Sequence, residues 1–126
     1  MPKTIPDLPG IEPGGYPFSQ VVEANGFVFL AGQVGELPGT HGAAAGGIVP
    51  ETRAMLDKVG RLLRAVGLDY ADVVKATVYL RDFSEFAEFN TVYREYFPTE
   101  PPTRATVGVT ALAADFRVEI EVLAVR

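Results

Sequence analysis

The first clear pattern along the chain is a pair of short apolar runs at residues 20–24 and 27–31. They are separated by Asn25-Gly26, a dipeptide that supplies the positive φ angles of a type I′ turn. The pair therefore predicts a β-hairpin. Residues 1–14 before it are punctuated by proline and glycine, which predicts an extended lead-in.

Two segments further along have apolar residues at helical spacing. A glycine-rich stretch at residues 35–49 predicts a flexible loop, and residues 50–66 after it predict a helix that ends before Gly67. A second helix is expected to begin at Asp82 and Glu85, which resemble a capping box. This helix is expected to run to about Phe97. The side chains on one of its faces are Phe86, Phe89 or Asn90, Tyr93 and Phe97.

Three later segments alternate between apolar and other residues, as strands do when successive side chains point to opposite faces. Residues 73–80 are expected to place Val74, Ala76, Val78 and Leu80 on one face. Residues 101–109 and 117–122 each carry a charged residue opposite their valines and isoleucines. The residues that share a face in these last two strands are Arg104, Thr106 and Gly108 in the first, and Glu119 and Glu121 in the second.

The resulting order is β-β-α-β-α-β, which predicts a single α+β domain over residues 1–126 with two helices on one face of a mixed sheet. The other face is then too apolar to be left in water and too polar for a monomer core, so we expect self-association. The residues expected on that open face are apolar residues of the strand at 27–31 together with Lys75, Thr77, Tyr79, Arg104, Thr106, Glu119, Glu121 and Leu123.

Composition narrows the possible partners and locations. The apolar fraction of 48% and charged fraction of 21% are those of a folded protein. The 11 basic residues are scattered among 16 acidic ones, and a net charge of −5 argues against a nucleic-acid partner. The prolines near the start indicate no signal peptide, and the longest apolar run is far too short to span a membrane. We therefore expect a cytoplasmic protein without a membrane partner.

Several kinds of chemistry are excluded by residues that the chain lacks. It has no cysteine, so it cannot use thiolate nucleophiles, disulfides or thiolate metal ligands. His41 is its single histidine, which excludes histidine-based zinc or iron sites. We expect no metal site.

Arg104 and Glu119 are the candidate catalytic pair. If their strands pair, both side chains are expected to line one polar recess, where the arginine fixes a carboxylate and the glutamate handles water. Such a pair taken alone is more often a surface or interface ion pair. Glu121 faces the same way as Glu119 and is the alternative partner.

Six segments of the chain resemble, in order and spacing, the Rid family of reactive enamine/imine deaminases, also called L-PSP endoribonuclease-like or YjgF-like. The resemblance covers essentially the whole chain from residue 15 onward. The matching segments are GYPFSQ at 15–20, AGQ at 31–33, DVVKATVYLRD at 72–82, FAEFN at 86–90, PTRATV at 102–107 and VEIE at 118–121.

The resemblance implies a chorismate-mutase-like fold assembled as a homotrimer with pockets at the subunit interfaces. It also implies hydrolysis, without a cofactor, of reactive 2-imino or enamino acids to 2-keto acids and ammonia. In this scheme Arg104 binds the substrate carboxylate and Glu119 positions the attacking water. The remaining substrate-binding positions that it implies are Phe18, Ala31, Gly32, Asn90 and Thr106.

Four positions depart from the usual family pattern. Phe18 stands where a tyrosine is usual, Ala31 for a serine, Thr106 for a cysteine and Gly108 for a glutamate. Because two pocket hydroxyls are lost, the substrate is left open. Two other functions also stay open: a non-catalytic trimer that binds 2-keto acids, and an endoribonuclease, which the net charge disfavours.

Overall fold

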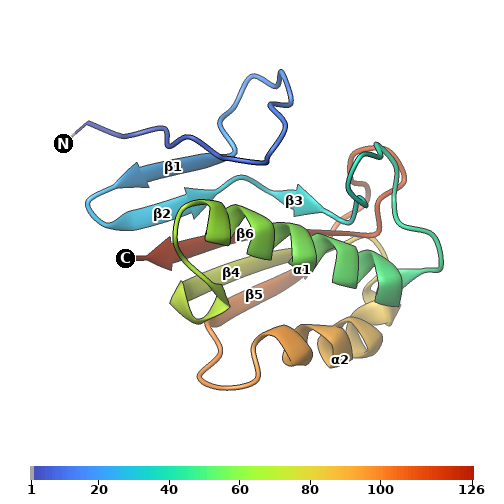
Figure 1. The fold of residues 1–126 in the computed structure, drawn as a ribbon. Helices are drawn as coiled ribbons and strands as arrows, with labels where there is room; N and C mark the ends of the chain where they lie inside the picture. Colours follow the sequence, from blue (N-terminus) through green and yellow to red (C-terminus); the bar gives the residue numbers. More distant parts are fainter. Residues whose placement is uncertain (1) are drawn as a thin grey trace.

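The computed structural model describes residues 2–126, which form one mixed sheet and two α-helices (Figure 1). The strand order is β1-β2-β6-β4-β5, and the short β3 pairs with β6 beyond β2. All pairs are antiparallel except β4 and β5. The elements are β1 (Val21–Ala24), β2 (Phe27–Leu30), β3 (Gln33–Val34), α1 (Ile48–Ala65), β4 (Val73–Leu80), α2 (Phe86–Tyr96), β5 (Thr103–Gly108) and β6 (Val118–Val125). The predicted α+β class and mixed sheet are confirmed; β3 is the one strand that sequence patterns did not predict.

The β1–β2 hairpin forms as predicted. Asn25 has a φ of 53° and Gly26 a φ of 81°, and Ala24 pairs with Phe27 across the turn. Both turn residues thus have the positive φ angles of a type I′ turn, which matches the twist of the two strands.

The core lies between the sheet and the two helices, which Figure 1 shows over the same face. The helix α1 begins two residues before the predicted start and ends before Gly67, whose φ of 81° terminates it. The residues of this core that are fully buried, with none of their surface exposed, include Val28, Met55, Leu56, Val59, Leu63, Ala76, Val78, Leu80, Phe89, Val118, Ile120 and Ala124.

Two local predictions are wrong. Val74 was expected to share the inner face of β4, but a bulge between Val73 and Lys75 turns Val73 inward and leaves Val74 44% exposed. The predicted capping box at the start of α2 also does not form. Asp82 instead caps a short 3₁₀ turn by accepting a hydrogen bond from the Ser84 N–H, and α2 begins after that turn.

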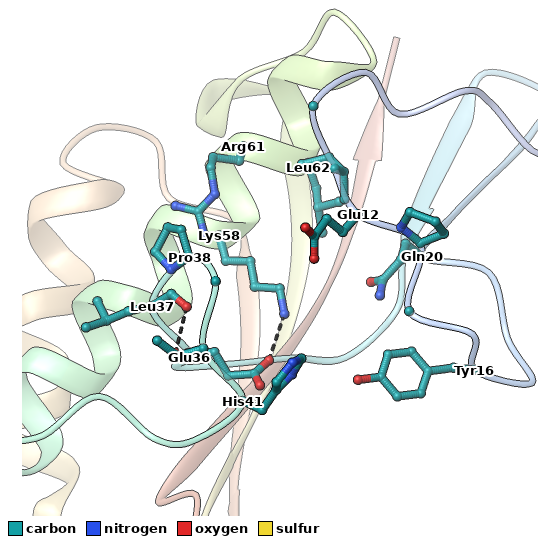
Figure 2. Close-up of a pocket in the computed structure, with 16 residues that line it drawn as sticks. Glu12, Tyr16, Gln20, Glu36, Leu37, Pro38, His41, Lys58, Arg61 and Leu62 are labelled. Atoms are coloured by element: carbon teal, nitrogen blue, oxygen red, sulfur yellow. Dashed lines mark hydrogen bonds and ion pairs between the residues drawn. The ribbon is translucent and has the colours of Figure 1, made fainter.

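The lead-in runs back against β1 and then beside α1. Thr4 forms an antiparallel bridge with Glu23. Further along, residues 10–16 lie opposite residues 36–41 and α1, and the three segments enclose an open cavity of about 380 Å³ (Figure 2). No helix within residues 2–126 is long and apolar enough to cross a membrane.

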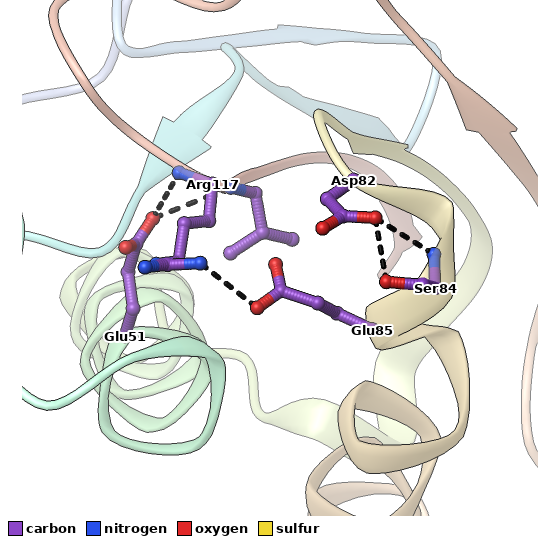
Figure 3. A network of polar contacts seen from close by, with 6 residues as sticks. Glu51, Asp82, Ser84, Glu85 and Arg117 are labelled. Atoms are coloured by element: carbon purple, nitrogen blue, oxygen red, sulfur yellow. Dashed lines mark hydrogen bonds and ion pairs between the residues drawn. The ribbon is translucent and has the colours of Figure 1, made fainter.

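A buried carboxylate joins the first turn of α1 to the start of β6 (Figure 3). Glu51 is 1% exposed, and its Oε2 accepts hydrogen bonds from the backbone N–H groups of Arg117 at 2.6 Å and Val118 at 3.3 Å. Burial raises the pKa of Glu51, an effect that these two hydrogen bonds oppose. The Arg117 guanidinium pairs with Glu85 at 2.8 Å, so α1, α2 and β6 meet at this point.

Glu51→Ala is expected to destabilise the fold by about 3 kcal/mol, because it leaves two buried N–H groups without an acceptor. Glu51→Gln keeps an acceptor oxygen, so it should cost clearly less. The measurement is the midpoint and slope of urea unfolding for both variants. Equal midpoints for Glu51→Ala and the parent protein would show that the contact adds no stability.

Candidate active site

Arg104 lies on β5, the edge strand of the sheet, on the face that the helices cover. It pairs with Ala76 of β4, which is fully buried beneath the helices, and Thr106 pairs with Val78 in the same way. Paired residues point to the same face of a sheet. Arg104 and Thr106 therefore point toward α2, and both are half-buried.

One face of α2 holds the Arg104 guanidinium in a fixed orientation. Asn90 accepts a hydrogen bond from Arg104 Nη2 at 2.8 Å. The guanidinium carbon also lies 4.6 Å from the ring centre of Tyr93, 5.4 Å from that of Phe89 and 5.7 Å from that of Phe86. We call these three rings the aromatic cradle. A guanidinium has five N–H donors, so those not used by Asn90 remain able to bind a carboxylate.

Two hydroxyl groups near this arginine are buried without a partner. Thr106 Oγ1 and the Tyr93 hydroxyl have no hydrogen-bond partner within residues 2–126. Burial raises the pKa of Tyr93, with a smaller opposing effect from Arg104, so the hydroxyl is neutral and able to donate. Two polar groups beside Arg104 thus have unused hydrogen-bonding capacity.

Glu119 lies on the opposite, open face of the sheet. It pairs with Tyr79 of β4 and Val34 of β3, while Ile120 beside it points into the core. Its carboxylate lies directly against Gly32, where any side chain would overlap Oε2. Ala31 precedes this glycine, so the structure brings together three of the predicted site residues, Ala31, Gly32 and Glu119.

Burial raises the pKa of Glu119, and the nearby charge of Glu121 raises it further. Glu121 is exposed and accepts a hydrogen bond from the Tyr79 hydroxyl at 2.7 Å. A carboxylate with a raised pKa is a stronger base than an ordinary one once it is ionised. Of the two glutamates, Glu119 thus has the environment of a general base.

The prediction that Arg104 and Glu119 line one recess of a single chain is wrong. The alternation of side chains within each strand is as predicted. However, β4 lies between β5 and β6, and its pairing with each of them decides which of their side chains share a face of the sheet. Ala76 pairs with Arg104 on the helix-covered face, whereas Tyr79 pairs with Glu119 on the open face. Arg104 and Thr106 therefore do not belong to the open face, where the sequence pattern placed them.

The other predicted site residues lie either beside Arg104 or beside Glu119, except Phe18. Asn90 and Thr106 lie with Arg104, and Ala31 and Gly32 with Glu119. Phe18 lies between the lead-in and β1, where it stacks on Tyr16 with ring centres 5.2 Å apart and 54% of each residue exposed.

The aromatic cradle was missed as part of the site, because the sequence pattern placed its rings on one face of the second helix without indicating what they contact. The sequence signal that could have found it is a row of aromatic residues along one face of a helix that packs over a strand carrying an arginine. Within residues 2–126 there is no group of three or more histidine, aspartate or glutamate side chains that could hold a metal ion.

Comparisons with known proteins identify the family of this chain. Residues 12–126 match the family described as Endoribonuclease L-PSP. The 2-iminobutanoate/2-iminopropanoate deaminase of Capra hircus is 41% identical over 110 residues, which cover 87% of this chain and 80% of that protein.

Solved structures share the fold over most of their length. The YjgF gene product of E. coli superimposes with a TM-score of 0.86 at 32% identity, covering 98% of each chain. E. coli TdcF, solved with bound serine, has a TM-score of 0.83 at 35% identity, covering 88% of this chain and 89% of that one. The chain therefore belongs to the Rid family, the family of the reactive-intermediate deaminases and of the YjgF-like and L-PSP-type proteins.

Proposed function

We propose that the protein hydrolyses 2-imino acids and their enamine tautomers to 2-keto acids and ammonia, without a cofactor. The observation that carries this proposal is the orientation of Arg104, which Asn90 and the aromatic cradle hold with donors to spare. Relatives at about 40% identity are named as deaminases of this class, and the TdcF structure holds an amino acid.

Arg104 binds the substrate carboxylate through two parallel N–H···O bonds. This bidentate contact fixes the position of the adjacent C=N carbon as well as the acid group, because the guanidinium is planar and lies against three rings. The arginine therefore supplies orientation, which brings the electrophilic carbon and the water together.

Glu119 positions a water molecule and accepts its proton. The water oxygen forms a bond to the imine carbon, the C=N electron pair moves to nitrogen, and the nitrogen takes up a proton to give a carbinolamine. Glu119 then transfers the hydroxyl proton to the amino nitrogen, the C–N bond breaks, ammonia leaves with the electron pair of that bond, and the C=O group of the keto acid forms. The raised pKa of Glu119 supports this role, since it makes the ionised carboxylate a stronger base toward water.

We propose that the complete pocket forms between subunits of a homotrimer. Arg104 is on an edge strand and Glu119 is on the opposite face, so two copies are needed to place both against one small substrate. The open face also leaves Phe27, Phe29 and Val107 between 42% and 46% exposed, an apolar surface suited to contact with another subunit. Sedimentation should give the mass of three chains; a monomer mass at all concentrations contradicts the assembly.

The activity is tested by generating imino acids in the cuvette with an amino-acid oxidase and following 2-keto acid and ammonia. The protein should accelerate both above the spontaneous rate. A non-catalytic binder, which the lost hydroxyls at Phe18 and Ala31 keep open, would instead be stabilised by 2-keto acids without faster ammonia release. RNA cleavage that survives purification would favour an endoribonuclease.

The acid side of the pH profile should identify which glutamate is the base. Glu119 accepts a proton only when ionised, so kcat/KM should rise with pH through its raised pKa and then level off. Glu121→Gln removes a neighbouring negative charge and so should lower the pKa of Glu119, moving this rise to lower pH with little change in the plateau. A collapse of the plateau in Glu121→Gln would make Glu121 the base instead.

A further inference from the structure

The open cavity beside α1 is separate from both parts of the proposed catalytic site. It lies between residues 10–16, residues 36–41 and the helix face that carries Lys58, Arg61 and Leu62 (Figure 2). Neither Arg104 nor Glu119 lines it. Its volume of about 380 Å³ is within the range of small-molecule sites, toward the lower end.

The charges around the cavity leave one cation and one anion without a partner. Lys58 Nζ and Glu36 Oε1 are 3.1 Å apart and satisfy each other. Arg61 and Glu12 form no ion pair within residues 2–126, although both line the cavity. A purely anionic or purely cationic ligand would therefore meet one like charge that nothing neutralises.

Neutral groups of the lining add hydrogen bonds and an apolar surface. Gln20 accepts a hydrogen bond from Gln33 at 2.9 Å through its oxygen, which leaves its amide N–H groups available. Figure 2 shows the Tyr16 hydroxyl pointing into the cavity. The half-buried Ile11 provides apolar contact beside the helix.

We propose that this cavity binds a zwitterionic α-amino acid with an aliphatic side chain. Arg61 binds the carboxylate, Glu12 binds the ammonium group, and the side chain lies against Ile11. Charge-assisted hydrogen bonds at both ends select a zwitterion over a 2-keto acid, which lacks the ammonium group. The site thus differs in ligand from the proposed catalytic pocket, whose arginine needs only a carboxylate.

The test measures binding of L-leucine by titration calorimetry to the full chain carrying Arg104→Ala, so that the proposed catalytic site does not contribute. Leucine should bind, and 4-methylpentanoate and 3-methylbutylamine, which each lack one charge, should bind at least about tenfold more weakly. Adding Arg61→Ala or Glu12→Gln should weaken leucine binding by a similar factor.

Arg64→Ala is the matched control, because Arg64 lies one turn along α1, pairs with Asp69 and does not line the cavity. It should leave leucine binding unchanged. No leucine binding in the Arg104→Ala protein overturns the proposal, as does binding that Arg61→Ala and Glu12→Gln leave intact. The Arg61→Ala variant that retains Arg104 should hydrolyse imines at the rate of the parent protein. The result for leucine binding at this cavity is therefore independent of the result for the proposed enzymatic function.

Discussion

Glu119→Gln is expected to lower kcat for imine hydrolysis by about 10²–10⁴-fold, the usual contribution of a general base. Glutamine has nearly the same shape as glutamate and fits against Gly32, but it cannot accept a proton from water. Because Glu119 does not hold the substrate carboxylate in this mechanism, KM should change little. The measurement is a steady-state comparison of 2-keto acid release, corrected for spontaneous hydrolysis.

Glu121→Gln is the matched control, since it makes the same chemical change two residues away on the same face of β6. It should retain the plateau activity that Glu119→Gln loses. A Glu119→Gln protein with more than half of the parent kcat would exclude Glu119 from proton transfer.

Arg104→Ala should lower kcat/KM by roughly ten- to a few hundred-fold or more, the value of a charge-assisted contact to a carboxylate. The loss should appear partly in KM, because the arginine binds the acid group, and partly in kcat, because it also orients the C=N carbon. Arg104→Lys should recover little, since an ammonium group neither binds a carboxylate through two parallel bonds nor stacks on Tyr93 in the same way.

Far-UV circular dichroism and the mass in solution should accompany these measurements, because Arg104 also contacts Asn90 and three rings. Asn90→Ala removes one orienting contact and leaves the guanidinium, so its effect should be smaller than that of Arg104→Ala. Unchanged keto-acid release by a folded Arg104→Ala protein would remove Arg104 from the mechanism.

Local sequence signals predicted most of the elements correctly. Asn25-Gly26 determines the hairpin because few dipeptides adopt two positive φ angles, and Gly67 ends α1 for a similar reason. The bulge at Val73 was not predictable, since an inserted residue in a strand of valines and alanines leaves the apolar pattern almost unchanged. The two-residue β3 is too short to show any alternation.

The relative placement of Arg104 and Glu119 illustrates the limit of sequence patterns. Alternation assigns each side chain to a face of its own strand, but only the register through β4 decides which faces coincide. That register depends on contacts between residues far apart in the chain. The family resemblance points to the two residues and Asn90 as candidates without this information, because it rests on motifs instead of geometry.

Through the aromatic cradle, one face of α2 both packs the core and positions Arg104, two properties that a protein engineer would want to adjust separately. Phe89 is a fully buried member of the core, and the same ring lies under the Arg104 guanidinium. A substitution that repacks this position for greater heat resistance will also move the carboxylate-binding group, so thermal tolerance and substrate preference are coupled through α2. Improved variants are better sought in α1, whose buried face makes no contact with Arg104 among the pairs described above.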